Sequence, residues 1–148
     1  MPPFLSNPVI QQVKDLFKGL RHPVEVIFFG SHTQNCGYCE QTLQLLNEVV
    51  VLSGLLSFQE CDLQQDAALA AQYGVDKAPA MVFTAPDGDR LIDYRIRFYG
   101  IPVGSEFTTF INDLLLVSRR DSGLSAETRR FLHELPKPVH LEVFVTPT

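Results

Sequence analysis

The sequence predicts an α/β fold in which a mixed four-stranded sheet is flanked by helices. A strand, a helix and a second strand follow one another over residues 24–62, which requires a right-handed parallel crossover. The turn sequence at 86–89 joins two later strands into an antiparallel hairpin. Amphipathic helical patterns before and after these strands provide helices for both faces of the sheet. Across the sheet we expect the strand order 56–62, 24–29, 80–84 and 91–99.

The first half of the chain alternates helical and strand patterns. Apolar residues recur at helical spacing over 7–20, with Asn7 as N-cap and Pro8 in the first turn. The β-branched and aromatic run 24–29 is typical of a buried central strand, which Gly30 ends. The next elements are a helix from residue 39 to about 54 and a strand over 56–62.

The second half begins with a short helix over about 66–73, where Gly74 can take the left-handed conformation that stops a helix. The runs 80–84 and 91–99 flank the turn and should form the antiparallel pair. Residues 107–117 then give an amphipathic helix that covers one face of the sheet.

The C-terminal segment resembles the start of the chain. A helix is predicted over 125–135 and a strand over 138–146. At an offset of 115, three residues are identical between the two segments and a fourth is similar: Leu20, Pro23, Val24 and Val26 match Leu135, Pro138, Val139 and Leu141. The pattern predicts one unit over 1–120 and the start of a second, truncated unit over 121–148. Its apolar strand, without a sheet of its own, could pair with another chain as a homodimer.

Composition excludes several classes of function. The net charge is −5 and charged residues are scattered, so the chain offers no basic face to nucleic acid. No stretch approaches the roughly 18 apolar residues of a membrane span, and no export signal is visible. Three cysteines are too few for a disulfide scaffold, which favours a cytoplasmic protein.

The motif Cys36-Gly37-Tyr38-Cys39 lies between the central strand and a helix, the context of redox-active dithiols. A cysteine at a helix N-terminus is stabilised as a thiolate by the helix dipole, so Cys36 should be the nucleophile. Cys39, one turn later, faces inward and can resolve a mixed disulfide. Gly37 and Tyr38 set the surroundings of the dithiol.

Alternatives stay open at the neighbouring residues. Cys36, Cys39 and His32 could hold zinc with a fourth ligand, although His32 is more simply a loop histidine close enough to affect the thiolate. Glu60 and Asp62 are alternate residues of one strand, on either side of Cys61, and either could accept a proton from Cys39 or face solvent. A lone Cys61 is more often a small buried residue than a third catalytic thiol.

The chain resembles the glutaredoxin-like protein disulfide oxidoreductases that carry two thioredoxin-fold units. The likeness spans essentially the whole chain and rests on four motifs: Cys36-Gly37-Tyr38-Cys39, Lys77-Ala78-Pro79-Ala80, 96–102 and 144–148. It implies a thioredoxin-like fold, Cys36 as attacking and Cys39 as resolving thiol, and a cis-proline substrate platform at Ala78-Pro79. Two departures bear on the redox potential: Gly37 stands where glutaredoxin motifs commonly have proline, and the strand 24–29 offers no aspartate beneath the resolving cysteine.

The expected activity is thiol-disulfide exchange on protein or small disulfides, without a cofactor. The implied partners are protein disulfides and a reducing protein such as a thioredoxin-reductase-like flavoprotein. One alternative is an electron-relay domain like the N-terminal part of alkyl hydroperoxide reductase flavoproteins, and another is a non-enzymatic zinc-holding or interaction module.

Overall fold

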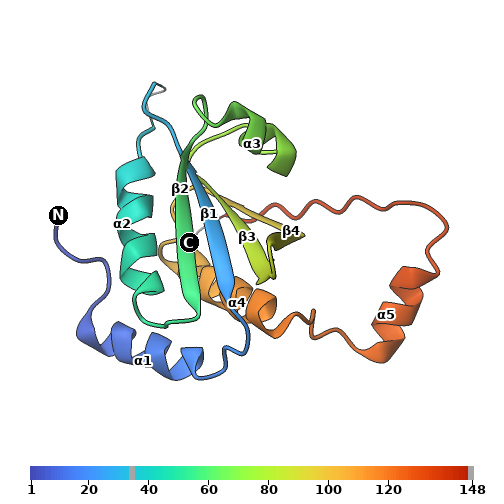
Figure 1. Cartoon of the computed structure of the whole chain (residues 1–148). Coiled ribbons are helices and arrows are strands. Elements are labelled where there is room, and N and C mark those ends of the chain that lie inside the picture. Colours follow the sequence, from blue (N-terminus) through green and yellow to red (C-terminus); the bar gives the residue numbers. More distant parts are fainter. Residues whose placement is uncertain (34–35, 147–148) are drawn as a thin grey trace.

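The computed structural model describes residues 1–33 and 36–146. Helices and strands alternate along most of the chain (Figure 1). In chain order they are α1 (Asn7–Phe17), β1 (Val24–Gly30), α2 (Cys39–Val50), β2 (Leu56–Asp62), α3 (Ala67–Tyr73), β3 (Ala80–Asp87), β4 (Arg90–Tyr99), α4 (Ser105–Arg119) and α5 (Ala126–His133).

The four strands form one mixed sheet in the order β2-β1-β3-β4, as the sequence predicts. Strand β1 runs parallel to β2 and antiparallel to β3, and β3 pairs with β4 as an antiparallel hairpin. Strand β1 is buried on both faces because it lies between two other strands and beneath helices on either side. Because β1 and β2 are parallel, their carboxyl ends meet at one end of the sheet, where Gly30 is opposite Asp62.

The two faces of the sheet carry cores of different size. On one face α1, α2 and α4 pack against alternate residues of β1 and β3, including Val26, Phe28 and Phe83. We call this the helix-rich face. On the other face the seven-residue α3 covers a smaller cluster that includes Ile27, Phe29 and Val82, and we call this the α3 face.

Most predicted boundaries agree with the structure to within a few residues. Strand β2 has the predicted limits, and α3 ends at Gly74, whose φ of 66° is left-handed. Helix α1 is shorter than predicted and ends at Phe17, whereas β3 extends beyond the predicted 84 to Asp87. The added residues of β3 pair with β4 across the hairpin, which the local sequence pattern does not reveal.

The C-terminal segment departs from the prediction. Helix α5 forms, with Ser125 as an N-cap whose side chain accepts a hydrogen bond from the Thr128 N–H. The predicted strand over 138–146 is wrong, because residues 136–146 contain no strand and their apolar side chains are exposed. A strand needs a neighbour to satisfy its backbone groups, and Figure 1 shows α5 standing apart from the sheet. Pro147 and Thr148 of the predicted C-terminal motif lie outside the described residues.

Across 1–33 and 36–146, no helix is long and apolar enough to span a membrane.

Candidate active site

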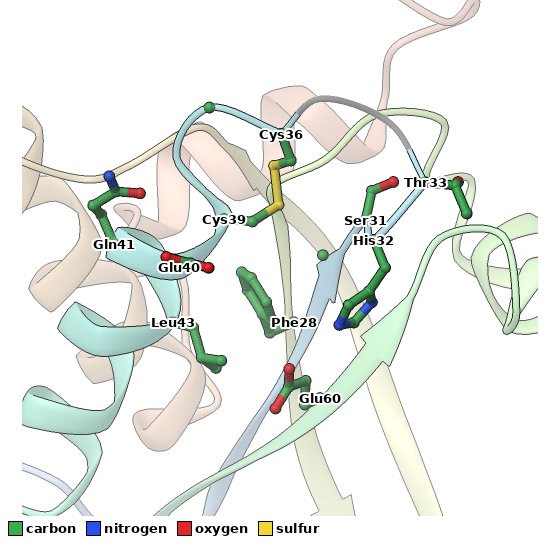
Figure 2. A pocket seen from close by; sticks show the side chains of 12 residues that line it. Phe28, Ser31, His32, Thr33, Cys36, Cys39, Glu40, Gln41, Leu43 and Glu60 are labelled. Carbon is green, nitrogen blue, oxygen red and sulfur yellow. A yellow bond between two sulfur atoms is a disulfide. The ribbon is translucent and has the colours of Figure 1, made fainter.

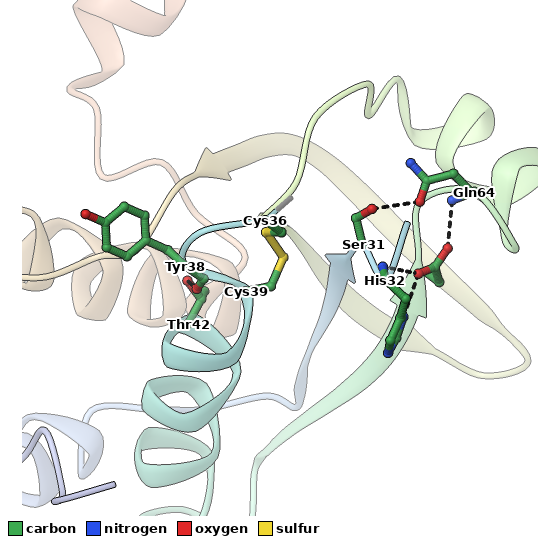
Figure 3. Close-up of a disulfide and its surroundings, with 8 residues drawn as sticks. Ser31, His32, Cys36, Tyr38, Cys39, Thr42 and Gln64 are labelled. Carbon is green, nitrogen blue, oxygen red and sulfur yellow. Dashed lines mark hydrogen bonds and ion pairs between the residues drawn. A yellow bond between two sulfur atoms is a disulfide. The ribbon is translucent and has the colours of Figure 1, made fainter. Parts of the chain in front are cut away.

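The dithiol motif lies where β1 leads into α2. Cys36 and Cys39 form a disulfide with their Cα atoms 5.5 Å apart. Cys39 is the first residue of α2 and Tyr38 is its N-cap. The Tyr38 carbonyl accepts hydrogen bonds from both the N–H and the hydroxyl of Thr42, at 2.9 and 2.7 Å, which fixes the first turn beneath the disulfide (Figure 3). The prediction that the motif begins a helix is confirmed.

Small residues leave room around the sulfur atoms. A Cβ added to Gly30, at the end of β1, would stand 3.2 Å from the Phe28 ring and 3.8 Å from the Cys39 Sγ. A side chain there would press on the Phe28 ring and would touch Cys39 only at ordinary van der Waals distance, so glycine leaves the ring in place beneath the disulfide. At Gly37 an added Cβ would meet nothing within 4 Å, and the Tyr38 side chain beside it is 60% exposed. The motif therefore presents an open outer surface.

Both cysteines line a cavity of about 730 Å³ at this end of the sheet. Figure 2 shows the disulfide at its upper rim, the Phe28 ring beneath it, and His32 and Glu60 along one side. The lining residues come from β1 and the loop after it, from the dithiol turn, from α2 and from β2: Phe28, Gly30, Ser31, His32, Thr33, Cys36, Gly37, Cys39, Glu40, Gln41, Leu43 and Glu60. A substrate group in the cavity would thus reach the disulfide, two carboxylates and one imidazole.

The two carboxylates of β2 play different parts. Glu60 is exposed and lines the cavity beside Phe28, its partner in the sheet. Asp62 is only 6% exposed. Its Oδ1 accepts the N–H groups of Gln64 and Gln65, at 2.9 and 3.0 Å, and its Oδ2 accepts the His32 N–H at 2.9 Å. Of the two, Glu60 is the carboxylate with access to the dithiol.

These hydrogen bonds hold Asp62 in its ionised form. The Gln65 N–H has the largest effect and the His32 side chain the next, and together with the other donors they lower the pKa of this carboxyl far below its usual value. A carboxylate that is this acidic accepts no proton near neutral pH. Asp62 therefore serves as a fixed negative charge.

His32 is joined to Asp62 by its side chain as well as by its backbone. The imidazole Nδ1 lies 2.7 Å from the Asp62 Oδ2, and this hydrogen bond, reinforced by the charge of Asp62, raises the pKa of His32. The loop is further fixed by a 2.8 Å hydrogen bond from the Ser31 hydroxyl to Gln64 (Figure 3). In residues 1–33 and 36–146, no three His, Cys, Asp or Glu side chains gather as a metal site.

Sequence reasoning considered His32 and Asp62 separately and missed their pairing. The sequence around Asp62 does indicate its hydrogen bonds to the turn, because an aspartate at the end of a strand commonly accepts hydrogen bonds from the backbone N–H groups two and three residues later. The partner 30 residues earlier could not be recognised, since it depends on the parallel alignment of β1 with β2.

The Ala78-Pro79 pair lies at the same end of the sheet. The peptide bond between the two residues is cis. Pro79 immediately precedes β3, whose first residue Ala80 pairs with Phe29 near the end of β1. The Pro79 carbonyl accepts a hydrogen bond from the Gly100 N–H at 2.9 Å, which ties Pro79 to the end of β4. The fold thus brings the two predicted motifs, the dithiol and Ala78-Pro79, to the same end of the sheet.

Cys61 lies on the α3 face, away from the dithiol. Its side chain is 5% exposed and packs in the smaller core cluster. Burial, with smaller effects from nearby Asp66 and Glu60, raises the pKa of the Cys61 thiol. A buried thiol of raised pKa is a poor nucleophile, so the interpretation of Cys61 as a packing residue is the better one.

The comparisons with known proteins give a fold. No protein-family model and no curated protein matches the chain. Among solved structures, a protein disulfide oxidoreductase from Aeropyrum pernix k1 is 24% identical with a TM-score of 0.74. That similarity covers 88% of this chain and 55% of the other. The alkylhydroperoxide reductase AhpF from Enterococcus faecalis, solved as a C503A mutant and as its NTD_N/C domain, is 22% identical with a TM-score of 0.77, covering 90% of this chain and 62% of the other.

These similarities confirm the thioredoxin-like fold. Both kinds of protein named from the sequence, the protein disulfide oxidoreductase and the alkylhydroperoxide reductase, appear among the similar structures. This chain spans less than two thirds of the length of either.

Proposed function

We propose that this protein is a thiol-disulfide oxidoreductase that exchanges its Cys36-Cys39 dithiol or disulfide with disulfides or dithiols of protein and small-molecule partners. The observation that carries the proposal is the disulfide between Cys36 and Cys39 at the start of α2, on the rim of an open cavity. A thioredoxin-like fold supports it, because the fold sets a Cys-x-x-Cys pair at a helix N-terminus, where the dipole favours thiolate.

The reaction passes two electrons from the dithiol to the substrate. The Cys36 thiolate attacks one sulfur of a substrate disulfide R–S–S–R′, forming a bond from Cys36 to the R sulfur and releasing R′S⁻, which takes a proton from water. The Cys39 thiol then loses its proton, and its thiolate attacks the Cys36 Sγ. RS⁻ leaves and the Cys36-Cys39 disulfide forms. A dithiol of a reducing partner restores both thiols by the reverse exchange.

Glu60 is the proposed proton acceptor for Cys39. It shares the cavity with both cysteines, whereas the second carboxylate of β2, Asp62, is engaged by several hydrogen-bond donors. A general base must reach the proton that it abstracts, directly or through one water, and the cavity between Glu60 and Cys39 can admit a water molecule. This assignment replaces the aspartate that β1 does not offer.

The proposed substrate-binding residues are Gly37, Tyr38, Ala78 and Pro79. Gly37 and the exposed Tyr38 form the outer surface of the dithiol turn, and Ala78-Pro79 lies at the same end of the sheet. An extended segment of a disulfide-bearing polypeptide could run across this end and hydrogen-bond to the backbone at Ala78. A protein disulfide therefore suits the site as well as a small one does.

The reducing partner is proposed to be a flavoprotein of the thioredoxin-reductase kind. Residues 1–120 would act as the working unit and 121–148 as the start of a second one. The exposed apolar side chains of 139–145 would be covered by the rest of that unit or, in a homodimer, by a second copy of the chain. We propose a cytoplasmic setting, because the three cysteines include one buried free thiol.

A second candidate function is an electron relay. The similarity to AhpF, with a TM-score of 0.77, favours a domain that passes reducing equivalents from a flavoprotein to one dedicated acceptor. A relay would interconvert its dithiol and disulfide rapidly while reducing general protein disulfides poorly. The two candidates thus share the chemistry and differ in the breadth of substrates.

Insulin reduction by dithiothreitol tests the proposal. The parent should accelerate precipitation of the insulin B chain, Cys36→Ser and Cys39→Ser should abolish the acceleration, and the matched control Cys61→Ala should retain it. Cys39→Ser should also trap a mixed disulfide with substrate on Cys36. An inactive parent with a reversible disulfide favours the relay, and a parent that retains zinc and forms no disulfide in air contradicts both.

A further inference from the structure

The loop that leads from β1 to the dithiol is fastened to the end of β2. Asp62 is the centre of this fastening: its Oδ2 accepts both the N–H and the Nδ1–H of His32, at 2.9 and 2.7 Å. The backbone of Asp62 is fixed in turn, because its N–H donates to the Asp66 carboxylate at 2.7 Å. His32 therefore has a position set by the sheet rather than by a free loop, although its side chain is 74% exposed.

The hydrogen bond to Asp62 also determines which nitrogen of the ring is available. Since Nδ1 donates to the carboxylate, Nε2 is the second ring nitrogen, and across residues 1–33 and 36–146 it has no hydrogen-bond partner. A carboxylate on one ring nitrogen orients a histidine and stabilises its imidazolium form. Figure 2 shows the His32 ring on the same side of the cavity as Glu60, with the disulfide at the rim above it.

The cavity otherwise carries negative charge. Among its described lining residues His32 is the single basic side chain, and Glu40 of α2 and Glu60 of β2 are the acidic ones. The charged and titratable groups around His32 are the cysteines of the dithiol, Glu40 from α2, Glu60 and Asp62 from β2, and Asp66 at the start of α3. Besides the dipole of α2, His32 is the one side chain among the described lining residues that can offset the charge of a thiolate formed in this cavity.

We propose that His32, held by Asp62, is the residue that supplies positive charge to the dithiol and stabilises its thiolate during exchange. Asp62 is the positioning residue of this pair. The inference rests on the proposed function and deepens it, because it assigns the charge control of the same site. The imidazolium also favours release of a substrate thiolate, because it can give that thiolate a proton, and the neutral imidazole then regains a proton from solvent.

The sign of the pH dependence follows from the direction of the shift. Because Asp62 raises the pKa of His32, the imidazolium persists to higher pH than in an ordinary histidine and is lost as the pH rises further. The contribution of His32 to thiolate formation is therefore greatest near about pH 6 and disappears near about pH 9. A residue with a purely structural role would affect the rate equally at both.

The kinetic test compares the parent with His32→Gln at several pH values, using reduced protein and a small aromatic disulfide. The control is His140→Gln, since His140 is also paired with a carboxylate, Glu142, at 2.8 Å, but lies in the C-terminal segment. We expect His32→Gln to react roughly three- to tenfold more slowly than the parent near pH 6, because less of its Cys36 is thiolate. The effect stays within this range because a thiolate of higher pKa is the stronger nucleophile and partly offsets the loss. Near pH 9 the rates should converge, and His140→Gln should match the parent throughout.

A second readout is independent of activity. Coupling between two charges is reciprocal, so a thiolate that gains from the imidazolium must stabilise it by the same amount. In an NMR titration of the full chain, the His32 ring should titrate at higher pH in the reduced than in the oxidised protein, and the ring signals of His140 should be unchanged between the two redox states. Asp62→Asn should reduce the difference at His32.

The outcomes separate the two proposals. If the parent exchanges disulfides but His32 titrates identically in both redox states and His32→Gln keeps the parent pH profile, the inference is overturned and the proposed function stands. If His32 responds to the redox state while the parent reduces no disulfide, the charge coupling stands and the proposed function fails.

Discussion

The two faces of the central sheet place cysteines in opposite environments at the same end of the molecule. On the helix-rich face, Cys39 packs at the upper end of the core and Cys36 lies beside it on the rim of an open cavity. On the α3 face, Cys61 is 5% exposed within a small closed cluster. Position at one end of a sheet does not make a thiol reactive; access and nearby charge do.

The faces also differ in how they are held. Three helices cover the helix-rich face and fix the strand residues beneath them, whereas a single seven-residue helix covers the α3 face. A large, multiply fixed core relaxes little around a void, and a thin one settles more readily. The dithiol is thus built on the more rigid side, which suits a site whose geometry must persist through both redox states.

The largest expected difference between the faces is in thiol alkylation. In the reduced native protein, iodoacetamide should modify Cys36 at least about 1000-fold faster than Cys61, since Cys61 must await an opening of the fold. Mass spectrometry of timed samples would measure both rates. In urea the two rates should become similar, and similar rates in the native protein would contradict the comparison.

Matched valine substitutions should show the difference in rigidity. Val26 on the helix-rich face and Val82 on the α3 face are both fully buried, in strands of the same sheet. Val26→Ala should lower the free energy of unfolding by about 2–3 kcal/mol and Val82→Ala by about 1–2 kcal/mol, because the thinner layer can collapse onto the smaller side chain. Urea unfolding of both variants measures this, and an equal or reversed order would refute the difference.

Asp62→Asn should change how stability depends on pH. Because the folded protein lowers the pKa of Asp62, its ionised form stabilises the fold above the ordinary aspartate range, and this contribution is lost as the pH falls through and below that range. The parent should therefore be more stable than Asp62→Asn at pH near 7, and the gap should narrow toward about pH 3. Urea midpoints at several pH values measure the gap, and a gap independent of pH would show that the charge is immaterial.

The smallest effect is expected outside both faces. Deleting residues 125–148 should change the free energy of unfolding of the remaining unit by less than about 0.5 kcal/mol, because α5 buries no residue and 136–146 are exposed. Thermal and urea unfolding test this. A clear loss of stability would mean that the segment packs on the unit in solution.

The sequence predicted the sheet well because its strands carry their own patterns. The run 24–29 and the crossover to 56–62 gave β1 and β2, and the turn at Gly88 gave the hairpin. The predicted strand over 138–146 has an equally clear pattern and forms no strand in the structure. The pattern of apolar residues indicates which face a strand would bury. Whether the strand forms depends on a neighbouring strand, which the local sequence does not reveal.

The candidate site divides in the same way. Cys36, Cys39 and the helix start were predictable, because the chemistry and the spacing lie within four residues. The choice between Glu60 and Asp62 was not, since both lie on one strand with the same parity. It is decided by the backbone N–H groups and the histidine that surround Asp62, which come from a turn and a loop brought together by the fold.

The exposed C-terminal residues have a practical consequence for anyone who handles the protein. Leu141, Val143, Phe144 and Val145 are each more than 80% exposed. Such side chains bind the hydrophobic dye anilinonaphthalene sulfonate, which is commonly used to detect partly unfolded states. The intact native chain should therefore fluoresce with this dye, and only the signal of the chain without residues 125–148 gives a baseline against which loosening of the core can be judged.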